Sequence, residues 1–63
     1  MKEGGVMSHY EVGEGSDKDS AVQEAIRRLI SAGHKPDDKK VFVRQIVQDP
    51  PTFKAKAHAA KRR

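Results

Sequence analysis

The chain has 63 residues, no cysteine, 13 lysines and arginines against nine acids, and a net charge of +4. The lack of cysteine excludes a disulfide framework and a thiolate zinc site, and the small number of apolar residues argues against a large enclosed pocket for a small-molecule substrate. Neither a secretory signal nor a membrane-spanning run is evident, so we expect a cytoplasmic protein without membrane contact.

Residues 1–16 predict a flexible, acidic N-terminal segment, because they hold four of the five glycines. The stretch Ser8–Val12 alternates enough to pair as a short strand if a neighbouring strand exists. Met7 competes with Met1 as the natural start of the chain.

Residues 17–32 predict an amphipathic helix. Val22, Ile26, Leu29 and Ile30 fall on one stripe at helical spacing, and this stripe is a candidate interface with a partner. Ser20 with Gln23 fits a capping box, and Gly33 suits the position that follows a helix. Residues 17–49 are therefore expected to form a small folded core.

The apolar element at residues 40–48 fits two structures. As a strand, it would place Val41 and Val43 on one side and Phe42 on the other, as its β-branched and aromatic residues favour. As a helix, it would start at an aspartate and stop before Pro50. Periodicity does not separate the two in so short a run.

Residues 50–63 predict a basic arm that is partly helical, because alanines and lysines are good helix formers. The arm has five bases and no acid, which is typical of a segment that follows a phosphate backbone. Arg27 and Arg28 could extend the same surface. The candidate nucleic-acid-binding residues are Lys39, Lys40, Arg44, Lys54, Lys56, Lys61, Arg62 and Arg63.

The stretch from Ala25 to Lys39 resembles the opening of winged-helix bacterial regulators of the GntR type, in which a helix ends in a glycine and an acidic, proline-containing turn. The resemblance implies DNA binding and, if residues 37–48 are helical, an outline similar to a helix-turn-helix. No family residue is carried over, because the resemblance covers no wing strand.

These features predict a small α/β or α-rich single domain that binds nucleic acid, either DNA or RNA, in a regulatory or ribosome-associated role. The alternative is a protein-interaction module or homodimer whose helix stripe is completed by a partner. The three histidines lie too far apart in sequence for a metal site, and no serine or carboxylate pair has a catalytic setting, so we expect neither an enzyme nor a cofactor.

Overall fold

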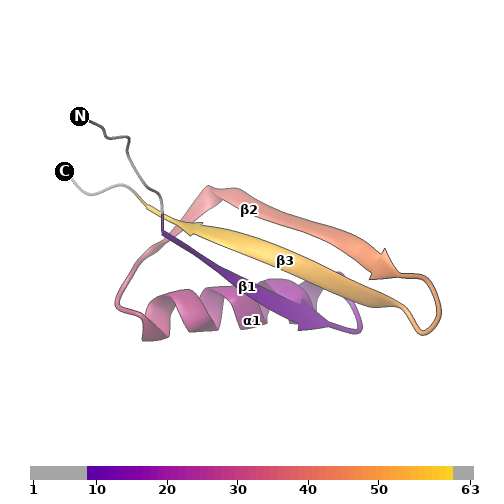
Figure 1. Ribbon diagram of the computed structural model, residues 1–63. Coiled ribbons are helices and arrows are strands. Elements are labelled where there is room, and N and C mark those ends of the chain that lie inside the picture. Colours follow the sequence, from indigo (N-terminus) through magenta and orange to yellow (C-terminus); the bar gives the residue numbers. More distant parts are fainter. Residues whose placement is uncertain (1–8, 61–63) are drawn as a thin grey trace, which may run out of the picture.

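The computed structural model describes residues 9–60, which form a three-stranded sheet with one helix on it (Figure 1). The elements are strand β1 (Tyr10–Gly15), helix α1 (Lys18–Ser31), strand β2 (Pro36–Val47) and strand β3 (Thr52–Ala59). The strand order is β1-β3-β2, and β3 is antiparallel to both neighbours. The outer strands therefore run parallel, and α1, which connects them, packs across one face of the sheet.

The expectation of an α-rich domain with a flexible N-terminus and a partly helical arm is wrong. Residues 10–15 form a strand, residues 40–47 adopt the strand alternative, and residues 52–59 form the central strand of the sheet. The helix-turn-helix outline is excluded for the same reason. The physical cause is tertiary: β3 pairs on both sides and buries Ala55 and Ala57, whereas an isolated helical arm of this length is marginal in water. Residues 1–8 of the expected flexible segment lie outside the described residues.

The helix expected from periodicity is found at Lys18–Ser31, with both ends capped. Its N-cap is Asp17 rather than Ser20: the Asp17 carboxylate accepts a 2.7 Å hydrogen bond from the Ser20 backbone N–H. At the other end, Gly33 has a φ of 89° and its N–H donates to Ile30, while the His34 N–H donates to Leu29. This pair of bonds is a Schellman motif, for which glycine is favoured at the left-handed position.

The Asp17 cap makes stability depend on pH. The backbone hydrogen bond from Ser20 lowers the pKa of the Asp17 carboxyl below its ordinary value. A carboxyl whose pKa is lower in the folded state stabilises the fold above its unfolded-state pKa, and this contribution is lost as the pH falls through the folded-state value. We expect Asp17→Ala to lower the melting temperature at pH 7 and to have a smaller effect at pH 2, where more of the carboxyl is protonated. In thermal melts at pH 7, Asp17→Asn should have a melting temperature between those of the unmodified chain and Asp17→Ala. An equal fall in the melting temperature of Asp17→Ala at both pH values would contradict the role of the Asp17 carboxylate as a cap.

The core is built mainly from small side chains. Ala21, Ala25 and Leu29 of the helix and Ala55 and Ala57 of β3 are fully buried, and Leu29 is the largest side chain among them. These alanines allow the helix backbone to approach the sheet closely. Stability in a domain of this size depends on that tight contact, because little other apolar surface is enclosed.

The helix stripe mostly packs within the chain. Val22 and Ile26 are partly buried against the core beside the buried Leu29, whereas Ile30 is 57% exposed. From β2 and β3, Val41, Val43 and Phe53 pack on the same core. Within residues 9–60, no helix is both long enough and apolar enough to cross a bilayer.

Candidate nucleic-acid interface

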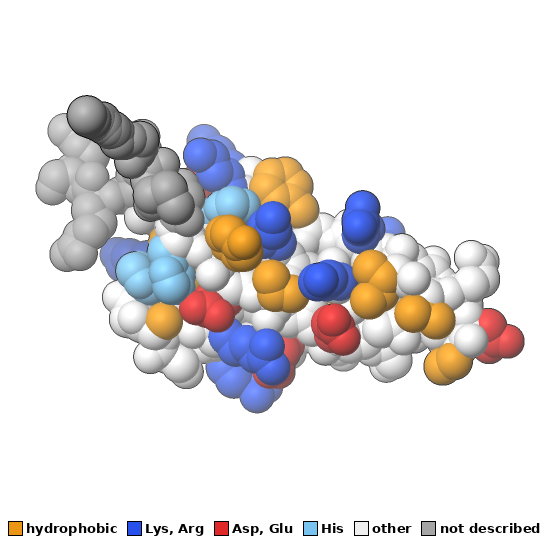
Figure 2. All heavy atoms as spheres, viewed as in Figure 1, with side chains coloured by type: hydrophobic (Ala, Val, Ile, Leu, Met, Phe, Trp, Pro, Cys, Tyr) orange, Lys and Arg blue, Asp and Glu red, His pale blue; other side chains and the backbone are white. Residues whose placement is uncertain are grey.

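The face of the sheet opposite α1 carries a mixed basic and aromatic surface. In β3, Lys54 and Lys56 are exposed, and they alternate with the buried Ala55 and Ala57. Because successive side chains of a strand point to opposite faces, both lysines project away from the helix. Within residues 9–60 this face lies away from α1, and basic, imidazole, hydrophobic and some acidic side chains are interspersed on it (Figure 2). We call it the open face.

Strand pairing arranges the open face in rows across the sheet. The first row pairs Tyr10 of β1 with His58 of β3. The second has Lys56 between Val12 and Phe42, and the third has Lys54 between Glu14 and Arg44. Rows on one face are about 7 Å apart along the strands. Three cations therefore lie on two neighbouring rows, next to the row that carries Tyr10 and His58.

The aromatic side chains of the open face contact one another. The His58 ring lies 5.4 Å from the Tyr10 ring and 6.0 Å from the Phe42 ring, measured between centroids, and the latter pair is edge-on. Lys56 Nζ lies 4.5 Å from the centroid of the Tyr10 ring, within the range of a cation–π contact. Tyr10 is nevertheless 47% exposed and Phe42 57% exposed. Both rings thus offer apolar surface to a ligand.

A shallow groove of about 550 Å³ runs over this surface, lined by Val12, Phe42, Arg44, Lys54, Lys56 and His58 among others. Among residues 9–60, none of its three cations forms an ion pair with an acid within 4.0 Å. Glu14 is the acid directly opposite Lys54 in the register. The groove therefore combines three cations with apolar walls, and one acid, Glu14, lies beside it.

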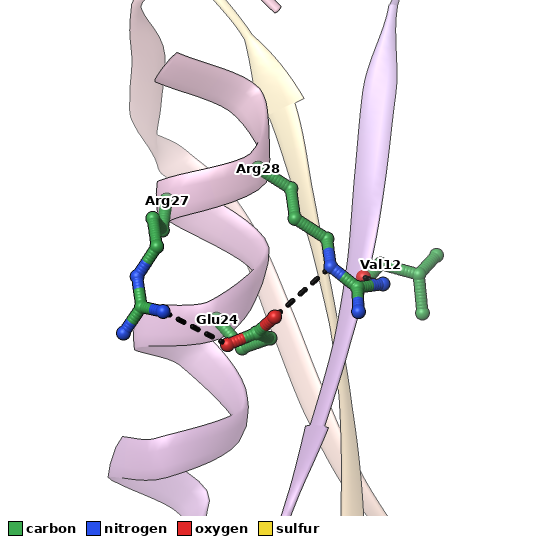
Figure 3. Close-up of polar contacts among 4 residues, drawn as sticks. All are labelled: Val12, Glu24, Arg27 and Arg28. Carbon is green, nitrogen blue, oxygen red and sulfur yellow. Dashed lines mark hydrogen bonds and ion pairs between the residues drawn. The ribbon is translucent and has the colours of Figure 1, made fainter. Parts of the chain in front are cut away.

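The arginines of the helix do not join this surface. Arg28 Nε lies 3.0 Å from one carboxylate oxygen of Glu24, and Arg27 lies 3.6 Å from the other (Figure 3). A second nitrogen of Arg28 donates a 2.9 Å hydrogen bond to the Val12 carbonyl of β1. Arg28 therefore ties α1 to β1, and neither Arg27 nor Arg28 lines the groove.

The structure brings together three of the eight basic residues singled out in the sequence: Arg44, Lys54 and Lys56. Lys39 and Lys40 are exposed in β2, where the register shifts between Pro36 and Val41, and they do not line the groove. Lys61, Arg62 and Arg63 lie outside the described residues.

Sequence reasoning missed the place of His58 and Val12 in the groove and treated His58 only as part of the arm. Phe53 packs against the core and does not line the groove. The alternation of residues 52–59 was the signal that could have placed His58 on the same face as the lysines.

The other two histidines lie at one end of the sheet. The His9 and His34 rings stack with centroids 4.1 Å apart, and His9 Nε2 lies 2.8 Å from a carboxylate oxygen of Glu11. Across residues 9–60, no three His, Asp or Glu side chains group in a way that could hold a metal ion. The contacts of His9 instead connect the start of β1 to the loop that follows α1.

The chain was compared with known proteins at the level of families, sequences and structures. No family model, curated protein or solved structure matches it.

Proposed function

We propose that this protein binds nucleic acid through the open face, with Arg44, Lys54 and Lys56 contacting the phosphate backbone. The observation that carries the proposal is the position of these three cations on neighbouring rows of an uncovered sheet face, beside exposed aromatic rings. The ligand class is the one expected from the sequence. The main contacts, however, come from paired strands β2 and β3 and not from a loose arm. The cytoplasm remains the compartment we propose.

The energetic basis is the release of counterions from the polyanion. Each phosphate neutralised by a lysine or arginine frees condensed counterions, so affinity falls with rising salt. Lys54 and Lys56 lie on the central strand, which is paired on both sides, and Arg44 is directly opposite Lys54. Their backbones are thus already fixed before binding, which lowers the conformational entropy lost on association.

The alternative of a partner-completed helix stripe has less support from the packing. Val22, Ile26 and Leu29 already pack against the core of their own chain. A second copy seated on the open face would bring its Arg44, Lys54 and Lys56 near the same residues of the first copy. The repulsion between these like charges opposes such an interface. The same cations attract a polyanion.

Removing the two central lysines should weaken nucleic-acid binding. We expect the double variant Lys54→Ala/Lys56→Ala to lose roughly tenfold or more in affinity at low salt, and the slope of log affinity against log salt to fall by about one to two. Fluorescence anisotropy with labelled oligonucleotides at several salt concentrations measures both quantities. The fold should persist, because both side chains are exposed.

The matched control is Lys18→Ala/Arg27→Ala, which removes the same charge from exposed positions on the helix. It should retain most of the affinity and the salt slope. Equal losses in the two double variants would show that only net charge matters and would overturn the assignment to the open face. No binding by the unmodified chain would overturn the function itself.

A further inference from the structure

We infer that the ligand of the open face is a single-stranded nucleic acid whose unpaired bases stack on Phe42 and Tyr10; this rests on the function proposed above and names its substrate class. The charges of the open face alone would suit any polyanion. The aromatic rings distinguish among these ligands, because only a ligand with accessible flat apolar surfaces can use them.

The exposure of Phe42 is the first argument. Its ring projects from a strand whose neighbouring residues Val41 and Val43 pack on the core, and it keeps 57% of its surface in contact with water. Its described ring contact is edge-on to His58, with an interplanar angle of 84°. A side chain of this kind contributes little to the core of its own chain but offers a surface on which a base can stack.

The placement of the cations relative to the rings is the second argument. Lys56 lies between Val12 and Phe42 on one row, and Arg44 and Lys54 lie on the next row, about 7 Å further along the strands. A base stacked on Phe42 would therefore have cations to its side. That is where the flanking phosphates of an unpaired strand lie, because phosphates project outward from the bases.

The shape of the molecule argues against a duplex. In a duplex, both faces of each base are covered by its neighbours, so the rings of Phe42 and Tyr10 would have no base to stack on. The major groove of DNA is about 12 Å wide and admits a helix or a two-stranded ribbon. The open face spans three strands, one more than such a ribbon. A duplex would therefore contact only the lysine and arginine side chains of the open face.

The test compares three single strands of equal charge that differ in their bases, together with a duplex, which carries about twice their charge. Labelled 12-mers of oligouridine, oligothymidine, an abasic strand and a duplex are titrated with the full chain at one salt concentration. We expect the two single strands to bind about tenfold or more tightly than the abasic strand, which is the effect of stacking one base or more. The uridine and thymidine arms separate RNA from DNA, and a preference for either supports the inference.

Variants of Phe42 then locate the stacking. Phe42→Ala should reduce the affinity for the single strands towards that of the abasic strand and leave the abasic and duplex affinities within about twofold. Ile30→Ala is the matched control, because Ile30 is an equally exposed large side chain on the helix. It should change none of the four affinities.

A second readout does not depend on affinity. The chain has no tryptophan, so Phe42→Trp introduces a single fluorescent indole into the groove. Its fluorescence should be quenched by oligouridine or oligothymidine and unchanged by the abasic strand. Equal binding of abasic and base-containing strands, or equal losses on all probes with Phe42→Ala, would overturn stacking while leaving phosphate binding intact. Failure to bind any probe would overturn the proposed function as well.

Discussion

A chain that ends at Asp49 is expected to be unfolded. This truncation removes β3, the central strand, and leaves β1 and β2 without the strand that pairs with each of them. It also removes Ala55 and Ala57, two of the five fully buried side chains. A domain of about 60 residues is stabilised by roughly 3–5 kcal/mol, and the loss of the sheet exceeds that margin. The helix would be lost too, since a 14-residue helix is marginal without tertiary packing.

Circular dichroism and thermal melting of the truncated chain measure this result directly. We expect a spectrum without strand or helix signal and no cooperative transition. The control is a chain that ends at Ala60, which keeps every residue of β3 and should melt cooperatively. A truncated chain that retained the helical signal would show that residues 50–63 are an appendage and would contradict the role of β3 in the core.

Residues 17–32 show where sequence reasoning succeeds. The apolar stripe and a glycine after the last turn specify the same helix, although its N-cap is Asp17 and not the expected Ser20. In that region, local signals suffice because a helix satisfies its hydrogen bonds within the segment.

Residues 52–59 show where the same reasoning fails. The stretch Thr-Phe-Lys-Ala-Lys-Ala-His-Ala alternates with period two, as a half-buried strand does. Alanine has the highest helix propensity and adds little apolar surface. Propensity therefore predicts a helix for this segment in spite of the alternation. What decides the structure is non-local: Ala55 and Ala57 fit beneath a helix that packs very close to the sheet. Propensity gives way to tertiary contact in such cases.

The sequence predicts which kinds of side chain the open face carries, but not how they are arranged. Clustered lysines and arginines indicated a polyanion, and the strand interpretation of residues 40–48 separated Phe42 from Val41 and Val43. The position of Tyr10 and His58 beside them depends on the order β1-β3-β2. That order is set by the crossing of α1 between two parallel outer strands, which no segment specifies by itself.

The close approach of helix and sheet depends most on Gly13. Gly13 is buried, and an added Cβ would lie 2.3 Å from the Ala25 backbone nitrogen and 2.6 Å from the Ala21 carbonyl oxygen. Both neighbours are helix backbone, so no side chain can rotate away to make room. The helix would have to move off β1, opening space above the buried alanines.

Gly13→Ala is therefore expected to remove most of the stability of the domain. Overpacking of a tight contact costs about 1–3 kcal/mol and occasionally more, against a total of roughly 3–5 kcal/mol. For a domain of this size, each kcal/mol shifts the melting temperature by roughly 4–8 °C. We expect a fall of roughly 10 °C or more, or a chain without a transition, in thermal melts followed by circular dichroism.

Gly33 provides the contrast that separates a steric cost from a backbone cost. An added Cβ at Gly33 would meet no atom within 4 Å, but its φ of 89° disfavours alanine. Gly33→Ala should cost about 1–2 kcal/mol, and Gly33→Asn should cost less, because asparagine tolerates the left-handed region. Gly13→Asn should be at least as damaging as Gly13→Ala, since a larger side chain worsens the clash. If asparagine rescued both positions alike, the helix would not be packed against β1 at Gly13.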